Sequence, residues 1–238
     1  MRTGFRSNCA RARCTLLNVS EAGREKRRLL ELFLRLSARF REARMRQFLE
    51  WFEVNSDTRI LDVGGTPASW AGLPVRPRVI IANLLRSREQ AAEGMEWVAA
   101  DGRSLPFPPG SFDIVFSNSV IEHVGEFSQQ ARMASEIRRV GRRYYVQTPN
   151  RAFPIEPHLL TPFVHNLPRR WQRVIVPRFT VWRMIARPSR DRVEYYLDHY
   201  LRDVRLLNRS RMQELFPDAA ILSERFLGLD KSWIAVKR

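Results

Sequence analysis

The chain has 238 residues, 44% of them hydrophobic, a length that suits one α/β domain carrying an added segment. Its formal net charge of +16, carried almost wholly by arginine, favours anionic partners such as nucleic acid, acidic lipid head groups or anionic small molecules. No apolar run approaches the ~20 residues of a membrane-spanning helix, and the first residues lack the apolar centre of a secretory signal. We therefore expect a cytoplasmic protein, with contact to the inner membrane surface left open.

The N-terminal part divides into a tail and a helix. Residues 1–20 are basic without any acidic residue, and we expect a disordered tail there. The only cysteines, Cys9 and Cys14, lie in this tail without further ligands nearby, so no metal site is expected. In residues 21–54, apolar residues recur at helical spacing, which predicts a long or broken amphipathic helix. Its apolar stripe would pack on the core or lie on a membrane or partner.

Short apolar segments then alternate with turns and helical patterns. Five segments have the pattern of strands: 59–63, 78–84, 95–100, 112–117 and 143–148. Thr66 and Pro67 open a short helix, since proline is favoured early in helices, and Phe127–Val140 has helical spacing. A helix at 210–215 and strands at 220–226 and 232–236, joined by a turn at 227–230, close the chain. This alternation predicts an α/β fold with a parallel sheet between helices.

Polar residues follow these strands where each one ends. Ligands of parallel α/β sheets bind outside the carboxyl ends of the strands, so these residues should converge on one molecule. The segments Asp62-Val-Gly-Gly-Thr66, Asp101-Gly-Arg-Ser-Leu-Pro-Phe107 and Ser111-Phe-Asp113 carry the pattern. Their order and spacing resemble the class I S-adenosylmethionine-dependent methyltransferases, in particular a bacterial small-molecule and glycan branch with Asp-x-x-x-Leu-Pro-Phe followed by Ser-Phe-Asp.

This resemblance covers residues 55–150 and 205–238, with 151–204 as an inserted cap on the acceptor side. It implies a Rossmann-like, mostly parallel seven-stranded sheet with an antiparallel last strand, and S-adenosylmethionine as cofactor. The residues that it places at the cofactor are Asp62, Gly64, Gly65, Thr66, Asn83, Leu84, Asp101, Gly102, Asn118 and Ser119.

Two of these positions depart from the usual pattern. The loop after the first strand keeps Gly64, but it has Thr66 and Ala68 where the family usually has two further glycines. Asn83 stands where an acidic residue commonly binds the ribose hydroxyls, and its amide oxygen can still accept a hydrogen bond. Asp101, at the end of the third strand, would accept the adenine amine, with a turn or helix-cap role as the alternative.

The resemblance implies methyl transfer from a sulfonium, in which the protein mainly aligns the reactants. An acceptor hydroxyl would need a base, and histidine is the natural candidate. His123 follows the fourth strand, and either a base or a structural role suits it. Glu156 and His158 lie in a proline-rich segment after the fifth strand, where they are either acceptor-side catalytic residues or parts of a stiff surface connection.

The inserted segment carries Trp171, Phe179 and Trp182 among arginines, with Glu156 as its acidic neighbour. It is either a structural cap or a binding surface for an anionic acceptor, a membrane face or nucleic acid. We expect O-methylation of a small or lipid-linked anionic acceptor, with N- or C-methylation left open. RNA or DNA methylation and a non-enzymatic binding module on the same fold are the alternatives. The acceptor and the oligomeric state are not specified by the sequence.

Overall fold

The computed structural model describes residues 24–84, 95–156, 161–180 and 189–238, so the predicted tail at 1–20 and its cysteines lie outside the described residues. The chain forms two compact units. The first contains Val54–Phe153 and Asp203–Arg238, and the second contains the helix that ends at Phe52 together with Pro154–Arg202. Each unit is described by itself below.

The first unit is built on a seven-stranded sheet of order β3-β2-β1-β4-β5-β9-β8. Its strands are β1 (Arg59–Val63), β2 (Arg78–Asn83), β3 (Met95–Ala99), β4 (Phe112–Asn118), β5 (Gly141–Pro149), β8 (Ala220–Phe226) and β9 (Leu229–Lys237). β1 to β5 pair in parallel, and β9 is antiparallel to both β5 and β8. The predicted Rossmann-like sheet with one antiparallel strand at the C-terminus is confirmed.

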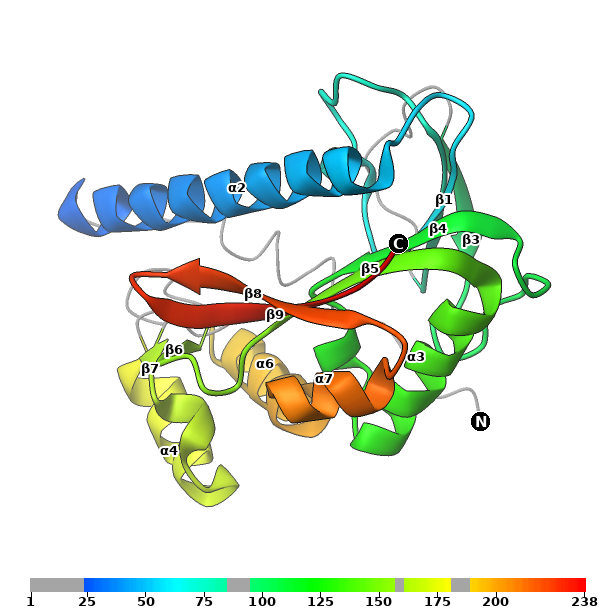
Figure 1. Cartoon of the computed structure of the whole chain (residues 1–238). Coiled ribbons are helices and arrows are strands. Elements are labelled where there is room, and N and C mark those ends of the chain that lie inside the picture. Colours follow the sequence, from blue (N-terminus) through cyan, green and yellow to red (C-terminus); the bar gives the residue numbers. More distant parts are fainter. Residues whose placement is uncertain (1–23, 85–94, 157–160, 181–188) are drawn as a thin grey trace. The chain divides into compact units, whose positions relative to one another are not determined.

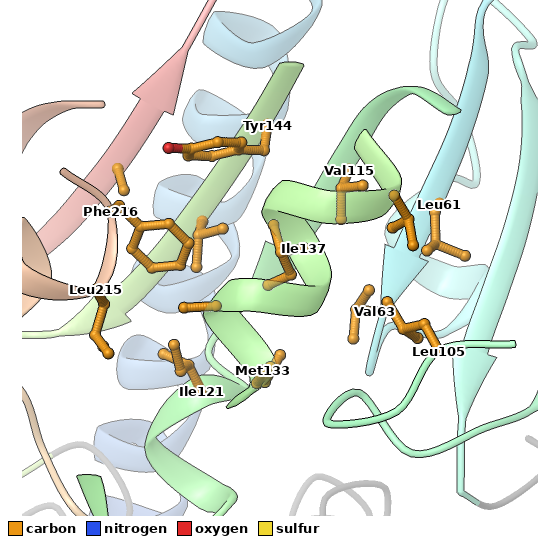
Figure 2. Packing of buried hydrophobic residues seen from close by; sticks show 14 of the residues in the cluster. Leu61, Val63, Leu105, Val115, Ile121, Met133, Ile137, Tyr144, Leu215 and Phe216 are labelled. Carbon is orange, nitrogen blue, oxygen red and sulfur yellow. The ribbon is translucent and has the colours of Figure 1, made fainter. Parts of the chain in front are cut away.

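Two helices, α3 (Phe127–Val140) and α7 (Arg209–Leu215), lie side by side against one face of this sheet (Figure 1). The core between them is shown in Figure 2 and includes Leu61, Val63, Val115, Met133, Ile137, Leu215 and Phe216, each at most 4% exposed. Burying a side chain of this size stabilises the fold by roughly 1.5–3 kcal/mol. This core therefore fixes the strands whose ends carry the site.

The connections after β1 and β3 contain no α-helix. Residues 64–77 contain the 3-10 helix η1 (Pro67–Ser69), which begins at proline as predicted. Residues 100–111, between β3 and β4, form turns without a helix. The carboxyl ends of these two strands are therefore shaped by tight turns, which bring backbone close to neighbouring strands.

The closing hairpin differs from the prediction at its turn. The sequence predicted a turn over 227–230, but β9 already begins at Leu229. The two central residues, Leu227 and Gly228, have φ of 49° and 80°. Positive φ at both positions is typical of a two-residue turn that matches the right-handed twist of the strands. β8 therefore ends at Phe226 and β9 begins at Leu229, so that the polar Asp230 belongs to the strand and not to the turn.

The second unit begins with the single long helix α2 (Arg24–Phe52), where the sequence predicted a long or broken one. It continues with the two-stranded β6 (Ile155–Glu156) and β7 (Thr161–Pro162), the 3-10 helix η3 (Val164–Asn166), α4 (Arg169–Phe179) and α6 (Arg190–Asp203). None of the helices in the described ranges is both long and apolar enough to cross a membrane.

Candidate functional site

The strand order reverses between β1 and β4, which defines a topological switch point. In the register, Val63 of β1 lies opposite Ala82 of β2, and Asp62 lies opposite Phe116 of β4. The residues that follow, Gly64 and Asn118 among them, therefore reach the same edge of the sheet. Open α/β sheets bind their ligands at this kind of edge.

The loop after β1 requires glycine at two successive positions. Gly64 has φ of 79°, and a Cβ there would lie 2.5 Å from Cγ1 of Val120. A Cβ on Gly65 would lie 1.7 Å from Oδ2 of Asp62. Both distances are far below van der Waals contact, so no side chain fits without movement. The loop therefore packs closely against Asp62 in β1 and Val120 after β4.

Asp62 lies beneath this loop and is only 1% exposed. Its Oδ2 accepts a 2.7 Å hydrogen bond from Nε1 of Trp70, whose ring meets Phe116 edge-on at 5.5 Å between centroids. Asp62 thus ties the segment after the glycines back to β1. Trp70 was not singled out by the sequence, where an aromatic residue in a loop gave no sign of an acidic partner. Thr66, predicted at the cofactor, precedes η1 in extended backbone.

Asn83 connects the end of β2 to the same loop. Its side-chain Nδ2 donates to the carbonyl of Gly65 at 3.1 Å. Because a carbonyl can only accept, this bond fixes the orientation of the amide and directs Oδ1 elsewhere. The oxygen that could accept from a ribose hydroxyl is therefore not used by Gly65. The adjacent Leu84 is 42% exposed, as an apolar residue that covers part of a bound ligand would be.

Asp101 and Gly102 form the turn after β3. A Cβ on Gly102 would lie 2.9 Å from Cγ1 of Val63, so this turn sits against the carboxyl end of β1. The Asp101 carboxylate accepts from the guanidinium of Arg103 at 2.6 Å and from the Arg103 backbone N–H at 2.9 Å. The hydrogen bond from the Arg103 side chain lowers the pKa of Asp101. The carboxylate therefore stays ionised, and its remaining lone pairs can still accept an amine.

Arg103 is a site residue that sequence reasoning missed. Its Nη1 also donates to Oε1 of Gln129 on α3, at 3.2 Å. Arginine two residues after a turn aspartate is ordinary on a basic surface, so its pairing could be found only in the structure. The pairing holds the Asp101 side chain in one orientation before any ligand binds.

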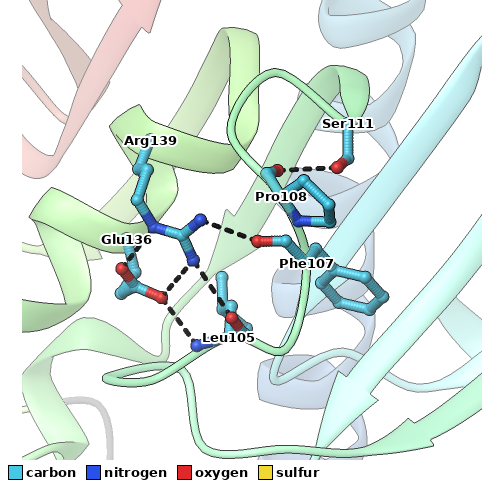
Figure 3. A network of polar contacts seen from close by, with 6 residues as sticks. All are labelled: Leu105, Phe107, Pro108, Ser111, Glu136 and Arg139. Atoms are coloured by element: carbon cyan, nitrogen blue, oxygen red, sulfur yellow. Dashed lines mark hydrogen bonds and ion pairs between the residues drawn. The ribbon is translucent and has the colours of Figure 1, made fainter.

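The Leu105-Pro-Phe107 segment is held by two residues of α3 (Figure 3). Glu136 Oε2 accepts the backbone N–H of Leu105 at 2.7 Å. Arg139 donates to the carbonyls of Phe107 at 2.7 Å and Leu105 at 3.0 Å, and forms an ion pair with Glu136 at 2.7 Å. Each of these bonds either joins Glu136 to Arg139 or joins one of these two side chains to the backbone of Leu105 or Phe107. This network fixes the path of the loop that carries Asp101.

We expect Glu136→Gln to lower the free energy of unfolding by about 1–3 kcal/mol at neutral pH, because the hydrogen bonds with Leu105 and Arg139 lose the carboxylate charge and one of the two acceptor oxygens becomes a donor. Glu136 has a lowered pKa, mainly through the Arg139 side chain, so this stability is present above its ordinary pKa of 4.5 and is lost as pH falls through the folded-state pKa. Chemical denaturation should therefore show the stabilities of the two proteins converging as the pH falls below the folded-state pKa of Glu136, which lies under its ordinary value.

Glu214→Gln is the matched control, because its i,i+3 partner Arg211 is 52% exposed and Glu214 itself 56% exposed. An exposed pair of this kind contributes about 0–1 kcal/mol. If both variants lost the same free energy of unfolding, the network of Glu136 and Arg139 would not stabilise the Leu105–Phe107 segment more than an exposed ion pair stabilises a helix.

The end of β4 contributes Asn118 and Ser119. Oδ1 of Asn118 is buried and has no hydrogen-bond partner within the described parts of the chain. Ser119 has φ of 56°, while its backbone N–H and hydroxyl bond to Gln147 of β5 at 2.9 and 2.8 Å. A buried acceptor without a partner costs about 1–3 kcal/mol, so such an atom next to a strained residue suits a ligand-binding edge.

Glu122 and His123 lie in the 3-10 helix η2 (Ile121–His123) directly after this edge. Glu122 is fully buried, and its Oε2 accepts from Oγ1 of Thr148 at 3.0 Å. The His123 side chain is 22% exposed, with Nε2 lying 3.9 Å from Oε1 of Glu122. The structure thus brings His123 to the predicted edge with a buried carboxylate beside it.

The other two predicted catalytic residues, Glu156 and His158, cannot be placed from the described residues. Glu156 ends β6, but its side chain is outside the described part of the structure, and His158 lies in the gap at 157–160. Both therefore stay predictions. Within the described residues, no three His, Cys, Asp or Glu side chains are arranged to hold a metal ion.

The sheet, its switch point and the glycine-containing edge define a Rossmann-like domain built to hold a ligand at the carboxyl ends of β1 to β4. Residues 68–143 match the family model of the methyltransferase domain. This part of the chain therefore resembles a methyltransferase domain, the kind of domain to which the sequence motifs pointed. Members of this class use S-adenosylmethionine as methyl donor.

Individual relatives are more distant. The biotin biosynthesis bifunctional protein BioHC of Cellvibrio japonicus is 31% identical over 136 residues, which cover 54% of this chain and 25% of that protein. The match thus spans about a quarter of the length of this curated relative.

Among solved structures, magnesium protoporphyrin IX methyltransferase from Synechocystis PCC 6803 with bound S-adenosylhomocysteine aligns with a TM-score of 0.57 and 11% identity, over 98% of this chain and 96% of that one. The 1,6-didemethyltoxoflavin-N1-methyltransferase of Burkholderia thailandensis gives a TM-score of 0.47 and 14% identity, over 76% and 69% of the two chains. The first of these alignments shows a shared fold.

Proposed function

We propose that this protein is an S-adenosylmethionine-dependent methyltransferase that acts on oxygen of a small or lipid-linked anionic acceptor. The observation that carries the proposal is the close packing at the switch point, where a Cβ on Gly64 would lie 2.5 Å from Cγ1 of Val120, after β4, and a Cβ on Gly102 would lie 2.9 Å from Cγ1 of Val63, in β1. The buried, unsatisfied Oδ1 of Asn118 fits a ligand donor at this edge. The family match at 68–143 supports the same class.

Each group at the edge has a role that its chemistry suits. The Asp101 carboxylate, ionised and oriented by Arg103, would accept the exocyclic amine of adenine, and Asn83 Oδ1 would accept from a ribose hydroxyl. Asn118 would meet the ammonium group at the methionine end. The bound cofactor supplies an electrophilic methyl group on a sulfonium, and the protein then has to align the acceptor and exclude water.

His123 is the candidate base for an acceptor hydroxyl. Protonation at Nε2, the nitrogen 3.9 Å from Glu122, would leave Nδ1 to accept the proton. Buried Glu122 would favour this tautomer and hold the ring in place, as carboxylates do for catalytic histidines elsewhere.

The acceptor class rests on charge and on the relative's name. A net charge of +16 attracts anionic molecules, and BioHC is named for the synthesis of a small molecule. RNA is the second candidate acceptor, favoured by the same net charge. Transfer of a labelled methyl group from S-adenosylmethionine to pooled anionic metabolites, lipid-linked glycans or mixed-sequence RNA tests the proposal. Label in the metabolite or glycan pool is the expected result, and label only in RNA would replace the acceptor class.

We expect His123→Gln to lower kcat by roughly 10²- to 10⁴-fold, the usual contribution of a general base, while leaving the Kd of S-adenosylmethionine within about twofold. Initial rates with the acceptor from the screen, together with calorimetric titration of the cofactor, measure the two quantities. His199→Gln is the matched control, since His199 lies on α6 with Nδ1 at the carbonyl of Tyr195. An unchanged kcat in His123→Gln would assign His123 a structural role.

A further inference from the structure

The exposed apolar side chains of the second unit are concentrated in one short stretch. Five large hydrophobic residues that face solvent lie within residues 163–179: Phe163 (61% exposed), Leu167 (36%), Trp171 (52%), Val174 (47%) and Phe179 (69%). The same stretch contains four arginines and neither Asp nor Glu. Single exposed apolar residues are ordinary on a protein surface, whereas a cluster of them rimmed by one sign of charge indicates an interaction site.

Three of these residues, Trp171, Val174 and Phe179, belong to α4 (yellow in Figure 1), and Phe163 and Leu167 flank the 3-10 helix η3 that precedes it. Gln172 and Val176, which are four residues apart, are 7% and 0% exposed and form the inner side of the helix. Trp171, Val174 and Arg178 follow the three- and four-residue spacing of the opposite side. α4 is thus amphipathic with an outer side that mixes apolar and cationic groups, instead of the purely polar outer side of an ordinary surface helix.

Phe163 is exposed although its backbone conformation is unfavourable. Its φ of 56° lies in the left-handed region, which bulky residues rarely adopt. The conformation is held by a 2.7 Å hydrogen bond from the Phe163 N–H to the carbonyl of Pro154. Glycine or asparagine would adopt this backbone at lower cost, and neither would place an aromatic ring in solvent.

We propose that this basic apolar surface, made of Phe163, Leu167, Arg170, Trp171, Val174, Arg178 and Phe179, docks on an anionic lipid bilayer. Arginines would lie at the head groups while aromatic and aliphatic side chains enter the boundary with the acyl chains, as in interfacial helices. Charge complementarity selects the lipid. A second copy of the chain would bring the arginines of two identical surfaces together. RNA bases would stack on the aromatic rings alone, whereas acyl chains would also take up aliphatic Leu167 and Val174.

Docking at this surface goes beyond methyl transfer and does not depend on it. Full-length protein without cofactor is sedimented with vesicles of phosphatidylcholine mixed with phosphatidylglycerol, and with vesicles of phosphatidylcholine alone. We expect binding to the mixed vesicles, weakened by salt. The double variant W171A/F179A should lose at least roughly tenfold in vesicle affinity, because two exposed aromatic groups no longer leave water. R170Q/R178Q should lose roughly 10- to 30-fold.

Matched controls come from the first unit. Leu227 is 85% exposed at the tip of the β8–β9 hairpin, so L227A removes an apolar group of similar exposure. R132Q removes an exposed arginine from α3. Both should bind vesicles as the unaltered protein does. Absence of vesicle binding, or equal binding by W171A/F179A and the unaltered protein, would overturn the proposal, and neither outcome bears on cofactor binding.

Discussion

Replacing Asp101 by alanine is expected to weaken the binding of S-adenosylhomocysteine by roughly 10- to 100-fold, since a charge-assisted hydrogen bond to the adenine amine is worth about 1.5–3 kcal/mol. The carboxylate is ionised, oriented by Arg103 and placed by Gly102 against the end of β1. Calorimetric titration of both proteins with the same ligand gives the ratio of their Kd values.

Asp113→Asn is the control for this change. Asp113 also has a lowered pKa, but it lies at the amino end of β4, where its Oδ2 accepts from the backbone N–H of Arg59 at 2.9 Å. It should retain ligand affinity while losing some stability. If Asp101→Ala bound as tightly as the unaltered protein, Asp101 would be the turn residue of the alternative interpretation, and the adenine would have to lie elsewhere.

The second large effect is expected at Gly65. A Cβ at this position would lie 1.7 Å from Oδ2 of Asp62, and that carboxylate cannot move freely because it is buried and bonded to Trp70. Gly65→Ala should therefore displace the loop, lower the free energy of unfolding by about 1–3 kcal/mol and weaken cofactor binding by roughly 100-fold. Thermal unfolding and the same calorimetric titration check the two effects.

Gly72→Asn is the matched control in the same connection. Gly72 has φ of 75° and no atom within 4 Å of an added Cβ, and asparagine tolerates this backbone conformation. Its affinity for the cofactor should stay within about twofold. Equal loss in Gly65→Ala and Gly72→Asn would mean that the loop responds to any added side chain, and that the contact with Asp62 is not the cause.

The fold was predictable because its signals are local and repeated. Buried strands such as Arg59–Val63 and Phe112–Asn118 are short apolar runs with a polar residue at the last or the penultimate position, and the parallel arrangement follows from the alternation of segments. The placement of Gly64 and Asn118 at one edge of the sheet follows from parallel pairing alone, so these two candidate site positions could also be predicted from the sequence. The predicted hairpin turn was too long because the polar Asp230 belongs to β9, and the two-residue turn depends on a positive φ at Leu227 that its residue type does not suggest.

The remainder of the site depends on contacts between distant residues. The hydrogen bonds to the Leu105 backbone come from Glu136 and Arg139, some thirty residues further along the chain. In the sequence, a pair of opposite charges on a helix does not indicate that it bonds to the backbone of a distant loop. Arg103 likewise appeared as one of many arginines in a basic chain. Side-chain pairing of this kind is decided by tertiary packing, which single-residue spacing does not encode.

The central claim is that the edge formed by the ends of β1 to β4 binds S-adenosylmethionine and its product. Calorimetric titration of the purified full-length chain with S-adenosylhomocysteine tests it most directly. We expect micromolar binding with one ligand molecule per chain, abolished or strongly weakened in Asp101→Ala and Gly65→Ala. No detectable heat at millimolar ligand, with protein that unfolds cooperatively, would contradict the methyltransferase assignment and leave the basic apolar surface of α4 as the main evidence on function.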